Sequence, residues 1–160
     1  MMTMTTQLTV STEIAATPDT VWALVSDLSK MGEWSPETDG VEWLRGATGP
    51  VPGATFKGSN HHGSKKWTTI GKITEADPGS RFAFRITAAG FKISEWRYDI
   101  EPAGSGCRVT ETWVDERGAI ARTIGRLTTG IADRGSHNRA TMQTTLEGLK
   151  ASAESAPSPG

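Results

Sequence analysis

Glu111 is the residue whose position most clearly suggests chemistry. It lies in a segment that alternates apolar and polar side chains, midway between Val109 and Trp113. Strand periodicity therefore places these three side chains on one face. If that face is the inner one, burial raises the pKa of the Glu111 carboxyl, which could then act as a general acid or donate a hydrogen bond to a ligand. Two structural readings stay open: a bulge shifts the register, or an arginine pairs with the carboxylate.

Asn60 and His62 form a second group of candidate polar residues. The same alternation places both on the face of Phe56, with Gly58 between them leaving room for a ligand. They could bind a polar group of that ligand, and His62 is a further candidate for moving protons. His61 faces the opposite side of the strand, which argues against a metal site made by the two adjacent histidines.

Metal and cofactor chemistry find little support in the sequence. A zinc site needs three or four convergent ligands, and the chain has three histidines and one cysteine. It contains no Gly-x-Ser-x-Gly motif, no phosphate-cradling glycine loop and no dinucleotide fingerprint. Cys107 follows a turn and is interpreted as a small packing residue. We therefore expect neither a metal nor a cofactor.

Composition predicts one globular domain. The chain has 160 residues and a formal net charge of −1, which gives no electrostatic case for nucleic acid or an anionic membrane as the main partner. No apolar run approaches the roughly 20 residues that span a bilayer, and the start lacks the pattern of a signal peptide. The single cysteine fits a reducing compartment, so we expect a cytoplasmic protein. The predicted boundaries are a flexible N-terminus at 1–6, one domain at 7–153 and a disordered tail at 154–160.

The elements that must position these residues follow from the patterns along the chain. Residues 7–14 alternate as a first strand, and Thr17-Pro18-Asp19 then opens a helix, because these residues suit the cap and the first turn. A second short turn over 28–31 is expected to end at Gly32. Six or so alternating segments between 41 and 115 predict an antiparallel sheet, with Phe82, Phe84 and Ile86 on one face of its clearest strand.

A long C-terminal helix is predicted from a stripe of residues with helical spacing: Ile131, Gly135, Asn138, Met142, Leu146 and Leu149. A leader segment at 119–130 carries Ile120, Ile124 and Leu127, which continue the same stripe. A kink or break is expected near Gly125 or Gly130, since glycine weakens a helix interior. The helix is expected to end after Ala153.

A single long helix on a curved sheet can hardly fill the space between them, so a hollow is expected there. The six tryptophans either close the core of the curved sheet or line this hollow, and the two readings are compatible. Asn138 lies within the apolar stripe and is either bonded to the backbone or aimed into the cavity. Asp133 and His137 are expected to form a surface pair or to meet a dimer partner.

Charged residues on the outer face of the sheet are expected to form cross-strand ion pairs. The residues involved are Arg85, Glu95, Arg97, Asp99 and Glu101.

The order of elements and several short motifs resemble the START-like superfamily (SRPBCC), which includes polyketide cyclases, aromatases, the birch pollen allergen and lipid-transfer proteins. The closest resemblance is to its small bacterial polyketide cyclase/dehydrase members. It covers roughly Leu8 to Ala153 and rests on Pro18–Trp22, Val25–Asp27, Trp34–Glu37, Gly53, Phe56, Gly58, Asn60, Glu95–Ile100, Asp133-Arg134 and His137-Asn138. It implies an α+β helix-grip fold, a curved antiparallel sheet of about seven strands around a long C-terminal helix. The superfamily holds enzymes, carriers and receptors, so the fold does not fix the function.

The favoured hypothesis is a protein, monomer or homodimer, that binds or carries a small hydrophobic molecule such as a lipid, fatty acid or polyketide, with residues 118–130 as a gate. The alternatives are a cyclase, aromatase or dehydratase that uses Glu111 or His62, and a regulatory protein acting through its surface. The predicted cavity residues are Phe56, Gly58, Asn60, His62, Trp67, Phe82, Phe84, Trp96, Tyr98, Glu111, Trp113, Ile131, Asn138 and Met142.

Overall fold

The computed structural model describes residues 6–155, so most of the predicted flexible N-terminus at 1–6 and of the predicted disordered tail at 154–160 lies outside the described residues. Seven antiparallel strands form one sheet in the order β1-β7-β6-β5-β4-β3-β2. The elements are β1 (Gln7–Ile14), α1 (Pro18–Val25), a 3₁₀ turn (Leu28–Lys30), α2 (Met31–Trp34), β2 (Thr38–Trp43), β3 (Thr55–His62), β4 (Lys65–Asp77), β5 (Arg81–Ala88), β6 (Phe91–Ala103), β7 (Gly106–Asp115), α3 (Ala119–Thr129) and α4 (Arg134–Ser155). This is the predicted helix-grip fold.

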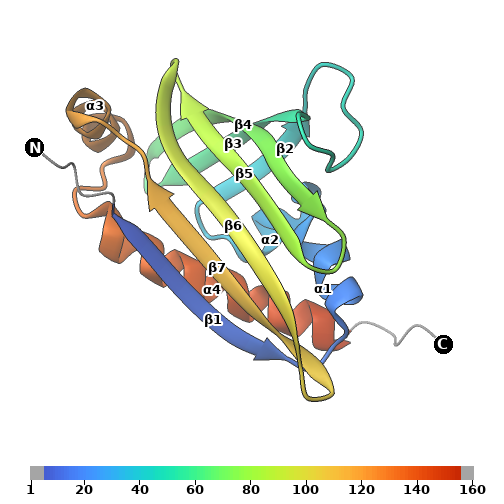
Figure 1. Cartoon of the computed structure of the whole chain (residues 1–160). Helices are drawn as coiled ribbons and strands as arrows, with labels where there is room; N and C mark the ends of the chain where they lie inside the picture. Colours follow the sequence, from blue (N-terminus) through green and yellow to red (C-terminus); the bar gives the residue numbers. More distant parts are fainter. Residues whose placement is uncertain (1–5, 156–160) are drawn as a thin grey trace, which may run out of the picture.

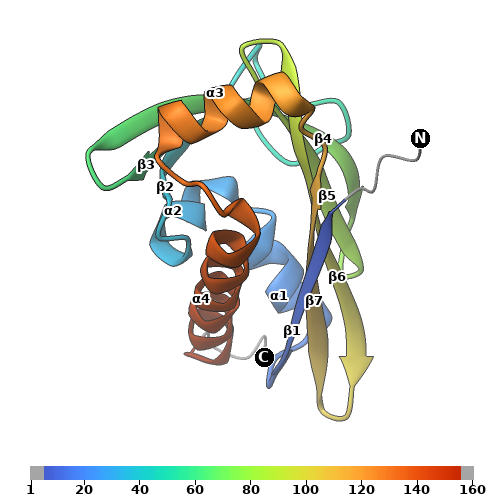
Figure 2. The same ribbon diagram turned by 90° about the vertical axis from the view of Figure 1, so that its left-hand side faces the viewer.

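The sheet is strongly curved, and α4 lies along its concave side (Figure 1). The short helices α1 and α2 cover one end of that side. Helix α3 crosses the other end, running from the end of β7 toward the β3–β4 hairpin (Figure 2). None of the helices within residues 6–155 is long and apolar enough to cross a membrane.

The two faces of the sheet carry the predicted division of side chains. Strands β6 and β7 pair without a register shift, so Tyr98 lies opposite Glu111 and Trp96 opposite Trp113 on the concave face. On the outer face, ion pairs join Arg81 and Asp99 at 2.6 Å, Arg97 and Asp99 at 3.1 Å, and Arg85 and Glu95 at 4.0 Å. These pairs lie at the surface with at least partial access to solvent, so they contribute little stability. Glu101 takes part in no ion pair within residues 6–155.

Helix α1 begins as predicted, with the Thr17 hydroxyl accepting a hydrogen bond from the Thr20 N–H at 3.2 Å. The predicted stop at Gly32 is wrong, because this glycine lies inside α2. That helix ends at Trp34 instead. Ser35 is extended, with ψ of 121°, as expected for a residue that precedes a proline.

The predicted break in the C-terminal helix occurs at Gly130, whose φ of 73° ends α3. Helix α4 starts at Arg134, three residues later than the predicted stripe, because the Asp133 carboxylate accepts hydrogen bonds from the N–H and the hydroxyl of Ser136. The expected surface pair of Asp133 with His137 is therefore replaced by a helix cap. The helix continues to Ser155, beyond the predicted end at Ala153.

Helix α4 divides the interior into a filled part and a hollow part. Its C-terminal half, with Leu146, Leu149 and Ala153, belongs to the same core cluster as the buried residues of α1 and α2. Packing there is tight, since a Cβ on Gly148 would lie 3.0 Å from the Trp34 ring. The N-terminal half of α4 instead faces a cavity.

Candidate functional site: a cavity between the sheet and the last helix

A cavity of about 520 Å³ lies between the concave face of the sheet and the N-terminal half of α4. Most of its lining is aliphatic or aromatic. The exposed lining residues include Ala89, Phe91, Ile124 and Thr128, from the β5–β6 hairpin and α3, so the cavity opens to solvent between these two elements. A hollow of this size and character is typical of sites for small molecules.

Most of the residues predicted for a cavity lie around it. Those that line it are Phe56, Gly58, Asn60, Trp67, Phe84, Trp96, Tyr98, Glu111, Trp113, Asn138 and Met142. They come from β3, β4, β5, β6, β7 and α4, and strand alternation brings them to one side. Gly71 keeps β4 close to β3, because a Cβ there would overlap the Phe56 ring.

Three predicted cavity residues lie elsewhere. The Phe82 side chain points to the concave face as expected, but it is fully buried in the hydrophobic core beside Phe84. Ile131 is buried in the loop between α3 and α4, since the helix begins later than predicted. His62 is the last residue of β3, and its ring turns from the main cavity toward His137, with the two ring centres 5.1 Å apart.

Glu111 is buried at the cavity wall with an exposed fraction of 2%. The Tyr98 hydroxyl donates a hydrogen bond to Glu111 Oε2 at 2.8 Å, while Oε1 has no hydrogen-bond partner within residues 6–155. Burial raises the pKa of Glu111 to about 8, and the hydrogen bond from Tyr98 opposes part of that rise. The carboxyl is therefore mostly protonated at neutral pH, and its buried Oε1 keeps an unmet hydrogen-bonding capacity in the described chain.

Neither structural alternative for Glu111 applies. The β6–β7 register is continuous across this residue, so no bulge turns its side chain outward. Its partner is a tyrosine and not an arginine. The same burial and the neighbouring carboxyl raise the pKa of Tyr98 well above its usual value, so this phenol stays protonated.

A second polar region lies at the end of the cavity near the start of α4. Arg134 Nη1 is 2.6 Å from Glu37 Oε1 and donates a longer hydrogen bond, at 3.4 Å, to Asn138 Oδ1. The guanidinium also lies over the Trp67 ring, 5.9 Å from its centre. Asn138 thus faces the cavity and bonds a side chain rather than the backbone. Asn60 donates to Thr69 Oγ1 at 3.2 Å.

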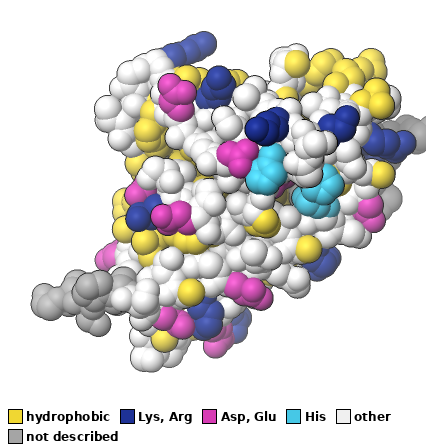
Figure 3. Space-filling view, turned by 180° about the vertical axis from the view of Figure 1, so that it is seen from behind, with side chains coloured by type: hydrophobic (Ala, Val, Ile, Leu, Met, Phe, Trp, Pro, Cys, Tyr) yellow, Lys and Arg dark blue, Asp and Glu magenta, His cyan; other side chains and the backbone are white. Residues whose placement is uncertain are grey.

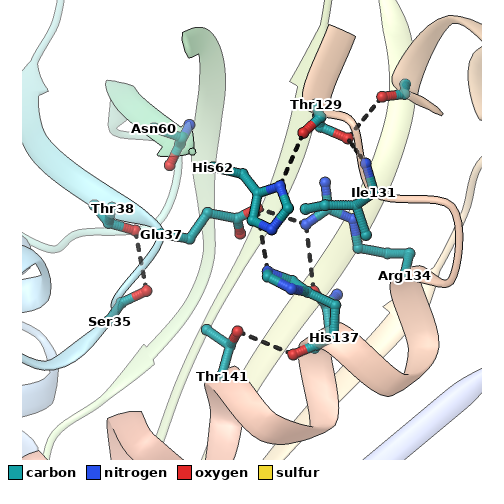
Figure 4. A network of polar contacts seen from close by, with 12 residues as sticks. Ser35, Glu37, Thr38, Asn60, His62, Thr129, Ile131, Arg134, His137 and Thr141 are labelled. Atoms are coloured by element: carbon teal, nitrogen blue, oxygen red, sulfur yellow. Dashed lines mark hydrogen bonds and ion pairs between the residues drawn. The ribbon is translucent and has the colours of Figure 1, made fainter. Parts of the chain in front are cut away.

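Behind this region, His62 and His137 border a smaller pocket of about 130 Å³. His62 Nδ1 lies 3.3 Å from the carbonyl oxygen of Thr129, next to the end of α3 (Figure 4). His137 Nε2 is 3.9 Å from Glu37 Oε1, and burial lowers the pKa of His137. Within residues 6–155, no three His, Cys, Asp or Glu side chains are arranged to hold a metal ion.

Sequence reasoning missed both Glu37 and Arg134 as site residues. The two are 97 residues apart, and Glu37 lies in the loop before β2, where no periodicity predicts its direction. It also missed Ala121 and Ile124 of α3, which line the cavity although the helix was treated as a leader of α4.

The fold and the cavity define the class of this protein: it is a helix-grip protein with a hollow between its sheet and its last helix. Residues 5–154 match the family model described as polyketide cyclase/dehydrase and lipid transport, so the chain belongs to that family.

Solved structures resemble it at low sequence identity. The di-domain ARO/CYC StfQ of the steffimycin biosynthetic pathway has a TM-score of 0.72 and 16% identity, over 94% of this chain and 51% of that one. A START superfamily protein from Mycobacterium smegmatis has a TM-score of 0.70 and 16% identity, over 92% and 97% of the two chains. The Polyketide_cyc-like protein Cgl2372 of Corynebacterium glutamicum has 26% identity and a TM-score of 0.57, over 94% and 93%. This chain thus spans about half the length of StfQ. A search of curated proteins finds no match.

Proposed function

We propose that this protein binds a small, largely apolar molecule in the cavity beside α4. The observation that carries the proposal is the cavity itself, about 520 Å³ of space with mainly apolar walls in a chain whose other half is tightly packed. Affinity would come from burial of the ligand's apolar surface, at about 25 cal/mol per Å². Family membership supports this role, since the family description includes lipid transport.

The electrostatics of the cavity favour an apolar ligand over an ionic one. Arg134 is neutralised by Glu37, and Arg117 by Asp115, with the Arg117 Nε and Asp115 Oδ1 atoms 2.9 Å apart. Glu111 is mostly uncharged at neutral pH because its pKa is about 8. A ligand charge would therefore meet no free counter-charge, and burying an unpaired charge is costly.

The test of binding uses two threonines of α4 that differ only in direction. Thr145 is buried and lines the cavity, whereas its neighbour Thr144 is exposed. Thr145→Phe should fill the hollow and weaken binding of N-phenyl-1-naphthylamine, an uncharged fluorescent apolar probe, by about tenfold or more. Thr144→Phe is the matched control and should bind as the wild type does. No probe binding to the wild-type protein, or equal binding to both variants, would count against the proposal.

Native mass spectrometry of the purified wild-type protein, followed by solvent extraction, identifies the chemical class of any molecule bound in the cavity. The same substitutions provide the control. A cavity ligand should be retained by Thr144→Phe and lost from Thr145→Phe.

A second candidate function is proton transfer to a bound substrate, as in a cyclase or dehydratase. The observation that favours it is Glu111, a protonated carboxyl at the wall with Oε1 unpaired within the described chain. Such an acid can protonate or polarise a ligand oxygen. His62 lies outside the main cavity, so this role would fall to Glu111 alone. Glu111→Gln should then abolish turnover of a candidate substrate while ligand binding persists, and retained turnover would remove this role.

A further inference from the structure

The outer face of α3 is an exposed apolar surface that the fold leaves uncovered. Ile120, Ile124 and Leu127, spaced by four and three residues, have exposed fractions of 67%, 46% and 72%. Figure 3 shows hydrophobic side chains gathered in this part of the molecule. The sequence predicted that these residues would continue the buried stripe of α4. They do not, because α3 crosses the open end of the concave side and only its inner face meets the cavity.

This apolar surface continues to the mouth of the cavity. Ile124 both lines the cavity and contributes to the exposed face of α3. Across the mouth, Phe91 of the β5–β6 hairpin also lines the cavity and has an exposed fraction of 38%. Contiguous exposed apolar surface of this kind marks a contact site for another body.

The surface is rimmed by positive charge, although the whole chain has a net charge of −1. Residues 117–131 contain Arg117, Arg122 and Arg126 and no acidic residue. Asp115 offsets part of this charge, since it pairs with Arg117 and lies 3.6 Å from Arg122. Arg126 has no ion pair within residues 6–155.

The hairpins beside α3 add further lysines. Lys65 follows the β3–β4 turn, and a Cβ on Gly130 at the end of α3 would lie 3.6 Å from its Cγ. Lys66 comes next in β4, and Lys92 follows Phe91 at the cavity mouth. All three lysines are exposed, and none is in an ion pair in the part of the chain that the structure describes.

We propose that α3 and the two hairpin tips beside it dock on a membrane surface that contains anionic lipids. A helix with an apolar face and flanking cations lies in the plane of the lipid interface, with its apolar side chains below the headgroups and its cations among them. The contact is peripheral and reversible, because only a few side chains enter the interface. A second copy of the chain is a poorer occupant, since two identical cationic rims would face each other.

Docking would also place the cavity mouth at the bilayer. If the cavity holds an apolar ligand, as the proposed function states, the ligand could then pass between bilayer and cavity without crossing water. This consequence rests on the proposed function, whereas the docking itself does not.

The test is flotation of the purified protein with vesicles of phosphatidylcholine, alone or with about 30% phosphatidylglycerol. We expect binding to the anionic vesicles only, and weaker binding at high salt. The double substitution Ile120→Ser with Leu127→Ser should reduce this binding by about tenfold or more. Arg126→Glu should do the same through charge. Val51→Ser is the matched control, since Val51 is 60% exposed in the β2–β3 loop, away from α3, and should leave binding unchanged.

Several outcomes would overturn the proposal. The first is that the wild-type protein does not bind anionic vesicles, and the second is that Val51→Ser loses as much binding as the α3 variants. The third is that the protein forms a dimer, or a complex with another protein, that only the α3 substitutions disrupt. Binding of the uncharged probe N-phenyl-1-naphthylamine separates this result from the proposed function. Neither Ile120 nor Leu127 lines the cavity, so the double variant should bind the probe normally. Failed flotation with normal probe binding would leave the ligand role standing.

Discussion

Glu111 is a buried carboxyl at the cavity wall, and its raised pKa lowers the stability of the folded protein at neutral pH. In the folded chain its pKa is about 8, against an ordinary value of 4.5, and burial is the main cause. Between these two pH values the unfolded chain loses the proton while the folded chain keeps it. The free energy of unfolding therefore falls as pH rises from about 5 to 8, and above pH 8 Glu111 gives no further pH dependence.

Glu111→Gln should remove this pH dependence. Glutamine has the same shape and remains neutral, and its side chain can still accept the hydrogen bond from Tyr98. We expect the variant to gain stability relative to wild type as pH rises from about 5 to 8, by a few kcal/mol over the interval. Denaturant unfolding at several pH values measures the difference. Parallel wild-type and variant curves would show that Glu111 ionises with an ordinary pKa.

Arg134 and Glu37 form the other polar group at the cavity, and both side chains are mostly buried, with exposed fractions of 14% and 17%. Removing one partner would leave the other charged and poorly solvated. Arg134→Met alone should therefore cost about 2 kcal/mol of stability. Adding Glu37→Gln should recover part of that loss, because no unpaired charge then remains. Urea unfolding of both single variants and the double variant gives the coupling energy, and strictly additive effects would contradict the pairing.

At the scale of the element, the end of α3 could be predicted from the sequence, whereas the direction of its apolar face could not. The break at Gly130 was predictable, since glycine weakens a helix and readily takes the positive φ that ends one. The direction of the apolar face was not. Periodicity says that Ile120, Ile124 and Leu127 share a face, but after a break the axis of a helix changes, and a continued stripe no longer points to the same side.

The position of α3 at the cavity mouth predicts that it controls ligand exchange. A cysteine at Gly130 would lie next to one at Lys65, since a Cβ on Gly130 is 3.6 Å from Lys65 Cγ. A disulfide between Lys65→Cys and Gly130→Cys should fix the end of α3 to the β3–β4 hairpin and slow release of N-phenyl-1-naphthylamine, with recovery on reduction. The positive φ of Gly130 makes a side chain there cost about 1–2 kcal/mol, so Gly130→Cys alone is the control. Unchanged exchange in the oxidised protein would remove the gate.

At the scale of the whole molecule, the alternating segments and the helical stripe were enough to predict the sheet, the long helix and a hollow between them. Strand alternation also placed Phe56, Trp96, Tyr98 and Glu111 on the concave face. The boundary of the hollow could not be predicted, because it depends on where α1 and α2 fill the concave side. Phe82 is an example, because its side chain points to the concave side as predicted but packs in the hydrophobic core and not in the cavity. The Glu37–Arg134 pair was out of reach for a related reason, since only the folded topology joins residues 97 apart.

This division into a filled half and a hollow half predicts how the stability of the molecule responds to ligand. The N-terminal half of α4 lacks apolar contacts on its cavity side, and a bound ligand would supply them. A cavity ligand at a concentration of 100 times its dissociation constant should therefore stabilise the wild-type protein by about 2.7 kcal/mol. Thr145→Phe places a ring in the same space and should make the unliganded protein at least as stable as wild type, while removing the gain from ligand. Thermal unfolding with and without N-phenyl-1-naphthylamine measures both effects, with Thr144→Phe as the control. A probe that stabilises Thr145→Phe as much as wild type must bind elsewhere, and the α3 face would then be the first surface to examine.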